Sequence, residues 1–346
     1  MRLAHVNIKR YWIIVTALCF IMFNLQAQKP AYKLYSGEGK KSSYKKMLAA
    51  AAGSDVILFG EHHTNPISHW LQLELSTDLY GEVGDRLVMG SEMFEADNQL
   101  LLDEYFAGLI TETKFEEEAR LWKNYQTDYK PLVLLAKVEG LDFIATNIPR
   151  RYANSVFKQG LPVLDKLSLE AKSYMAPLPL EYDTALNCYR ELMGGMDGVK
   201  ETPMAAKKPA MPGEKMPATP GDTKPAMPGG TDGVHTAGKK MPPVTGGMGK
   251  GISTKLADAQ AIKDATMSHF ILENWSPGKV FIHYNGAYHS DNYESMNWFL
   301  ERDSPGLKIV TISTVSQDEV NELEEESLGK ADFIICVPST MTKTSR

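Results

Sequence analysis

Short apolar runs alternate with amphipathic stretches along most of this 346-residue chain. Each run is rich in β-branched or aliphatic residues, and nearly every one is followed by turn residues and a helical pattern. Near-continuous apolar strands that alternate with helices are typical of a parallel sheet covered on both faces. The sequence therefore predicts an α/β fold with a mainly parallel sheet flanked by helices. The predicted strands are 55–59, 86–91, 142–145, 279–284, 307–312 and 332–337.

Two longer helical stretches interrupt this alternation, at 96–137 and 167–192. We expect them to form a helical cap subdomain beside the sheet. A further helix is predicted to open at Ser316-Gln317-Asp318-Glu319, because a serine followed three residues later by glutamate is a capping box.

The amino terminus is typical of a secretory signal peptide. Basic residues precede the apolar run 11–25, and a small residue, Ala27, follows it. The run is shorter than the roughly 20 residues that a membrane-spanning helix needs. We therefore expect residues 1–27 to be removed from an exported protein that is periplasmic or on the cell surface.

Residues 195–253 differ in composition from the rest of the chain. They are rich in proline, glycine, lysine, threonine and methionine, and the sequence KPAMPG occurs at 208–213 and again at 224–229. Such a segment buries too little apolar surface to offset its ordering entropy, so we predict a disordered insertion. Methionine thioethers suit copper(I), but most of these methionines stand alone beside proline, which favours a flexible linker. The insertion would divide one α/β domain into 28–194 and 254–346.

The overall charge and the missing motifs exclude several classes of function. The formal net charge is −6 at pH 7, whereas binding to nucleic acid needs a dense basic face. The chain contains no P-loop, no Gly-x-Gly-x-x-Gly, no Gly-x-Ser-x-Gly, no His-Glu-x-x-His and no Cys-x-x-Cys-His. Most nucleotide-dependent functions and covalent haem attachment are therefore disfavoured.

Polar side chains follow four consecutive predicted strands at the points where the strands end. They are His63 after the first, Glu92 after the second, Asn147 after the third and His289 after the fourth. Ligands of open α/β sheets bind at the carboxyl ends of the strands. The sequence therefore predicts one polar site built from these strand ends.

Two of these residues occupy similar turns. Gly60 precedes His63 and Gly286 precedes His289 at the same spacing, so the two imidazoles could face one another across the strand ends. Together with Glu92 they form a trio that could activate water or bind a divalent metal such as zinc.

Four further residues near these turns have their own expected roles. His69 lies one helical turn into the following helix and either joins the site or packs structurally. His62 is expected to point away from the site, and His283 lies within an apolar strand. Glu61 could orient a histidine or pair with an arginine of the 150–151 pair.

The blocks around these residues, taken in order, resemble the ChaN-like haem-binding proteins. That family belongs with the Tiki proteases and erythromycin esterases in one superfamily, and the resemblance covers most of 54–194 and 254–302. The matching blocks are Gly60-Glu61-x-His63-x-Asn65-Pro66-x-x-His69-x-x-Gln72, Glu92-Met93-Phe94 with Gln99, Trp122 with Tyr125, Asn147-x-Pro149-Arg150, Ala259-Gln260 with Asp264 and Met267, and Gly286-x-x-His289.

The resemblance implies an exported protein that holds haem non-covalently and serves iron uptake. Its partners would be haem, surface or outer-membrane uptake components and a second copy of the chain. Phenolate oxygen is a known type of haem ligand, and arginines can hold propionates by bidentate contacts. The implied haem-binding residues are His63, His69, Tyr125, Tyr129, Arg150, Arg151, Tyr288 and His289.

Position 288 departs from the family pattern. The family usually has a second glycine just before the last histidine, whereas this chain has Tyr288. Its ring could supply a haem ligand or narrow the pocket.

A rival interpretation is a metal-dependent hydrolase, a peptidase or esterase of the same superfamily. There, His63 and His289 would act on water with Glu92 as the base, and Arg150 or Arg151 would stabilise an oxyanion. A third alternative is a vestigial site in a scaffold whose insertion captures copper or a partner. In the first two cases, His63→Ala and His289→Ala should abolish binding or turnover and leave thermal stability nearly unchanged.

Overall fold

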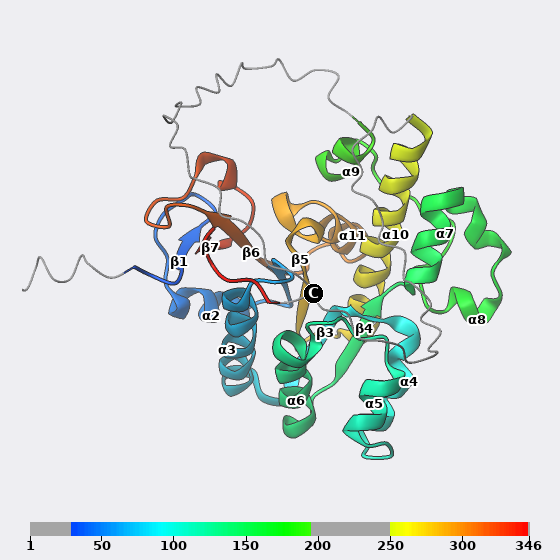
Figure 1. The fold of residues 1–346 in the computed structure, drawn as a ribbon, viewed down its shortest axis with the longest axis horizontal. Coiled ribbons are helices and arrows are strands. Elements are labelled where there is room, and N and C mark those ends of the chain that lie inside the picture. Colours follow the sequence, from blue (N-terminus) through cyan, green and yellow to red (C-terminus); the bar gives the residue numbers. More distant parts are fainter. Residues whose placement is uncertain (1–28, 195–249, 345–346) are drawn as a thin grey trace, which may run out of the picture.

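The computed structural model describes residues 29–194 and 250–344, so the predicted signal peptide and most of the predicted insertion lie outside the described residues. A seven-stranded sheet in the order β1-β7-β6-β2-β5-β3-β4 forms the centre of the fold (Figure 1). All neighbouring strands are parallel except the edge pair β1 and β7. The strands are β1 Lys33–Ser36, β2 Val56–Glu61, β3 Leu87–Glu95, β4 Phe143–Asn147, β5 Val280–Gly286, β6 Ile309–Gln317 and β7 Phe333–Pro338.

The predicted α/β fold and all six predicted strands are confirmed. The strands read as continuous apolar runs because helices cover both faces of the sheet. Along β2, Ile57 and Phe59 belong to one core cluster and Val56 and Leu58 to another. The first cluster packs under α2 (Tyr44–Ala52), α3 (Pro66–Val83) and α6 (Lys130–Glu139). The second packs under α10 (Lys250–Asn274) and α11 (Met296–Asp303).

Both stretches predicted to form the helical cap contain helices. The first holds α4 (Gln99–Phe106), α5 (Glu112–Glu118), a π-helical turn (Tyr125–Tyr129) and α6. The second holds the short helices α8 (Leu169–Lys172) and α9 (Asn187–Leu192). Between the two stretches, α7 (Arg150–Gln159) packs against α10. Across the described ranges, no helix is both long enough and apolar enough to cross a membrane.

The helix predicted from the capping box after Ser316 is wrong. Strand β6 continues to Gln317, and residues 318–324 form a loop. The side-chain amide of Gln317 donates to the backbone carbonyls of Glu319 and Glu322, and its Oε1 accepts from the backbone N–H of Glu324. This one side chain satisfies backbone groups that a helix would otherwise pair, so the loop is stable without helical hydrogen bonds.

The packing of β3 against its neighbours leaves no room for a side chain at Gly90. A Cβ added there would lie 2.7 Å from Cζ of Phe281 and 3.2 Å from Cγ2 of Thr146. We expect Gly90→Ala to lower the free energy of unfolding by about 1–3 kcal/mol, because close-packed cores tolerate overpacking poorly. Urea denaturation measures the effect.

Gly81→Ala is the matched control for this substitution. Nothing lies within 4 Å of a Cβ added at Gly81, which is inside α3. Alanine should therefore raise stability there by about 0.5–1 kcal/mol. A Gly90→Ala protein as stable as the wild type would contradict the described packing.

Candidate functional site

The carboxyl ends of β2, β3 and β5 meet at one polar pocket. The register of the sheet places Glu61 at the end of β2 directly beside Gly286 at the end of β5. The pocket has a volume of about 770 Å³, and its walls include His63, Glu92 and His289. The structure therefore brings together the three residues that the strand-end pattern singles out.

His63 lies in the turn between β2 and α3. Oδ1 of Asn65 caps α3 by accepting from the N–H groups of Ile67 and Ser68, so the helix starts only after the histidine. Nδ1 of His63 is 2.9 Å from Oε1 of Glu61, and the ring packs edge-on against Trp122. Within the described residues Nε2 has no hydrogen-bond partner, and the side chain is 27% exposed at the pocket.

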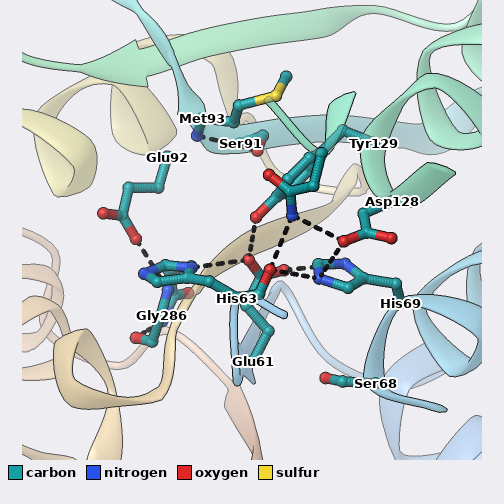
Figure 2. Close-up of polar contacts among 12 residues, drawn as sticks. Glu61, His63, Ser68, His69, Ser91, Glu92, Met93, Asp128, Tyr129 and Gly286 are labelled. Carbon is teal, nitrogen blue, oxygen red and sulfur yellow. Dashed lines mark hydrogen bonds and ion pairs between the residues drawn. The ribbon is translucent and has the colours of Figure 1, made fainter. Parts of the chain in front are cut away.

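Gly286 makes room for this histidine. A Cβ at position 286 would lie 2.8 Å from Cε1 of His63 and 3.5 Å from Oε2 of Glu92. Figure 2 shows the His63 ring on the Gly286 and Glu92 side of Glu61, with His69 on the other side. The glycine is therefore needed for close approach rather than for an unusual backbone angle.

Glu61 is buried and holds the ring of His63 in place. It also accepts hydrogen bonds from Nε2 of Gln72, at 2.5 Å, and from the hydroxyl of Tyr129. Burial acts to raise the pKa of Glu61, but the charge of nearby His69 and the hydrogen bond with His63 lower the pKa below its usual value. Glu61 therefore orients a histidine, as one of the two sequence-based alternatives proposed, and does not pair with an arginine.

His69 is enclosed by oxygen atoms. Its Nδ1 is 2.9 Å from Oε1 of Gln72, and its Nε2 is 3.1 Å from the backbone oxygen of His63 and 3.5 Å from Asp128. The same carboxylate accepts from Asn124. Since both ring nitrogens face acceptors, His69 joins α3 to the π-helical turn and presents no nitrogen to a ligand.

Glu92 and His289 form a second buried cluster on the far side of Gly286. Oε2 of Glu92 accepts from the N–H of Gly286 at 2.8 Å, and Oε1 is 3.5 Å from Nε2 of His289. Nδ1 of His289 is 2.5 Å from Asp264 on α10, and the hydroxyl of Tyr189 donates to the other oxygen of Asp264. One imidazole thus lies between two buried carboxylates.

These contacts favour the protonated form of His289. Burial alone would lower the pKa of His289, but Glu92 and Asp264 outweigh burial and raise the pKa to about 10. Burial likewise acts to raise the pKa of Glu92, yet His289 lowers it well below the usual range. Both nitrogens of His289 therefore face acidic groups, and burial raises the pKa of one of them, Asp264, above its usual value. No group of three or more His, Cys, Asp or Glu side chains in 29–194 and 250–344 is placed to hold a metal ion.

The three tyrosines singled out by the resemblance occupy different environments. Tyr288 lines the pocket, is partly exposed and donates from its hydroxyl to the backbone oxygen of Cys188. Tyr129 is buried and bonded to Glu61. Tyr125 is buried in the main core cluster, where its ring packs against Phe94 and Phe115. Of the three, Tyr288 alone reaches the pocket.

Arg150 and Arg151 do not line the His63 pocket. Together with Arg120 they surround a separate hollow of about 440 Å³ beyond the ends of β3 and β4. Nε of Arg150 is 3.5 Å from Glu95, and Nη1 of Arg151 is 2.5 Å from Asp97. The arginines are therefore held by neighbouring acids beside the site rather than in it.

Comparisons with known proteins identify the family and the fold. A family model described as haem-binding uptake, Tiki superfamily, ChaN matches residues 47–300. The chain belongs to this family. Its fold is similar to a solved structure titled "Cofacial heme binding to ChaN of Campylobacter jejuni", with a TM-score of 0.56 and 15% identity over 88% of this chain and 96% of that one. Among curated proteins, none matches. The predicted family is confirmed.

In this ChaN-family chain, several residues of the site could not be predicted from the strand ends, because they do not follow a strand. Asp264 and Asp128 come from helical segments far from any strand end, although Asp264 appears in the family blocks. His283 is buried and bonded to Thr146, and burial lowers its pKa to about 4, as expected of a structural residue. His62, expected to point away, lies in the pocket wall instead.

The two site histidines should differ in what they contribute to stability. His289→Ala would leave Glu92 and Asp264 buried without their cation, so we expect a loss of about 3–5 kcal/mol. His63→Ala removes a partly exposed ring and should cost about 1 kcal/mol. Thermal and urea denaturation of both variants measure this difference. From the sequence alone, both substitutions were expected to leave stability nearly unchanged, and the contacts of His289 change that expectation. Equal losses would contradict the described charge network.

The raised pKa of His289 predicts a pH-dependent stability. A raised pKa stabilises the folded state fully below the unfolded value of 6.5, and this contribution is lost as pH rises toward about 10. Over that window the wild type should lose up to about 1.4 kcal/mol per pH unit more than His289→Gln. Urea unfolding at several pH values measures the difference. If the free energy of unfolding of the two proteins changed with pH in the same way, the raised pKa of His289 would be contradicted.

Proposed function

We propose that this protein binds haem non-covalently in the His63 pocket and serves haem or iron uptake after export. The observation that carries the proposal is Nε2 of His63, which lies beside Gly286 in the pocket wall and has no hydrogen-bond partner among the described residues, while Nδ1 is held by buried Glu61. Membership of a haem-binding uptake family supports the same ligand.

His63 has the surroundings of an axial ligand. Metal-binding histidines usually place their second ring nitrogen on a carboxylate, which fixes the ring and raises its basicity. Glu61 does this for His63, and Gln72 and Tyr129 in turn hold Glu61. Imidazole is a common axial ligand of haem iron. Tyr288 is less suited, because burial raises the pKa of its phenol well above the usual range and disfavours the phenolate.

The pocket suits a large, partly apolar ligand. Its volume of about 770 Å³ lies within the roughly 300–1,000 Å³ typical of cofactor sites. Ala287, Tyr288, Pro338 and Met341 provide apolar surface in its walls. Gln260 also lines it, and its buried Oε1 lacks a hydrogen-bond partner among the described residues. These features fit haem, which would supply the iron chemistry when bound.

Export and partners complete the proposal. The signal-like segment 1–27 would direct the protein out of the cytoplasm, where uptake of haem from surface or outer-membrane components takes place. A second copy of the chain could share the haem.

A hydrolase fits the pocket less well. A general base needs a pKa near the working pH, whereas His289 holds the pKa of Glu92 well below its usual range. Oε2 of Glu92 is also occupied by the N–H of Gly286. The proposed oxyanion partners, Arg150 and Arg151, lie in the neighbouring hollow.

Titration of mature protein, residues 28–346, with hemin tests the proposal. We expect a Soret shift that saturates at a fixed stoichiometry. His63→Gln should weaken binding more than about tenfold, because it removes the proposed iron ligand. His269→Gln is the matched control, since His269 on α10 lies outside this pocket and should bind hemin as the wild type does.

The two possible failures have different meanings. A wild type without a saturable Soret shift would refute haem binding. Saturable binding that His63→Gln leaves unchanged would refute the site.

A further inference from the structure

Haem carries two propionate carboxylates, so a haem pocket needs cationic partners at its rim. Two lysines line the His63 pocket, Lys263 from α10 and Lys343 from the segment after β7. Neither amine has an ion-pair or hydrogen-bond partner among the described residues. Free ammonium groups beside a pocket are suited to bind carboxylates.

The carboxy-terminal segment is held against the site. The N–H of Thr344 donates to the backbone oxygen of Thr64 at 2.9 Å, and its hydroxyl donates to Asp128 at 2.6 Å. Figure 1 shows this end of the chain near the middle of the sheet, beside β5 and β3. Lys343, one residue earlier, is therefore fixed close to the His63 turn.

Lys263 lies on α10 next to a residue that is held in the core. It precedes Asp264, whose carboxylate is bonded to His289 and Tyr189, so the backbone of α10 is anchored at this point. The side chain is half-buried in the pocket wall. The two lysines thus reach one pocket from two separate elements.

The arginines suggested by the family resemblance are poorer candidates for this role. Arg150 and Arg151 lie in the neighbouring hollow, and each is already in contact with an acid, Glu95 or Asp97. A propionate there would compete with these carboxylates. One acid of the His63 pocket, Asp291, is not paired with a histidine. Its carboxylate instead accepts a hydrogen bond from the hydroxyl of Ser313 at 2.6 Å.

We infer that Lys263 and Lys343 bind the propionate carboxylates of haem, so that the carboxy-terminal segment is part of the haem site. This inference rests on the proposed function and names the groups that would orient the ligand in the pocket. The contact is between each ammonium group and a carboxylate, so it should disappear when the carboxylates are esterified.

Affinities for hemin and for hemin dimethyl ester test the inference. Lys263→Met and Lys343→Met should each weaken hemin binding about fivefold, and the double variant should weaken it further. Neither substitution should change the affinity for the ester, which lacks the charges. Lys45→Met, at an exposed lysine of α2, and Arg150→Gln are controls expected to leave both affinities unchanged.

Chemical protection provides a second readout. Acetylation of amines, followed by mass spectrometry, should label Lys263 and Lys343 more slowly when hemin is bound, and should label Lys45 at the same rate. Esterified hemin should protect the two pocket lysines less.

The outcomes separate this inference from the proposed function. If wild-type protein binds neither hemin nor its ester, both fail. If hemin binds but the lysine variants bind it as tightly as the wild type, the propionate contact is refuted and haem binding stands. An equal loss for hemin and ester, or a selective loss in Arg150→Gln, would also refute the lysine contact.

Discussion

The site depends on two carboxylates, Glu61 and Glu92, buried at neighbouring strand ends. A buried carboxylate needs charged or hydrogen-bonded partners, so each one fixes the groups around it. Glu61 is hydrogen-bonded to Nδ1 of His63, so that Nε2, beside Gly286 in the pocket wall, is left without a hydrogen-bond partner among the described residues. Glu92 takes the N–H of Gly286 and, together with Asp264, encloses His289. His63 therefore keeps one ring nitrogen without a hydrogen-bond partner among the described residues, whereas both ring nitrogens of His289 face carboxyl groups.

Most of the fold could be predicted because buried parallel strands leave a plain signature of apolar runs between helices. Strand β1 was missed since it is only Lys33–Ser36, paired along one side at the sheet edge. The capping-box helix was wrong for a different reason. Its sequence matches a helix start, yet the side chain of Gln317 pairs the loop backbone in place of helical hydrogen bonds. The motif is the same in both cases, and only the direction of this side chain, toward residues 319–324, decides between helix and loop.

The sequence predicts which residues lie at the site, because the sheet topology sets their positions. It does not predict the contacts they make there, because those depend on packing. Parallel strands place His63, Glu92 and His289 at one edge whatever surrounds them. The two Gly-x-x-His turns looked equivalent in sequence, and the difference between them comes from Asp264 on α10. Lys343 likewise reaches the pocket only because the chain end is bound by Thr64 and Asp128. Neither contact has a sequence spacing that would reveal it.

The most direct test of this account is a crystal structure of the mature protein with hemin, with the iron located by anomalous scattering. We expect iron bound to Nε2 of His63, with His289 still between Glu92 and Asp264. Iron bound to His289, or haem outside the His63 pocket, would contradict the assignment of Nε2 of His63 as the iron ligand.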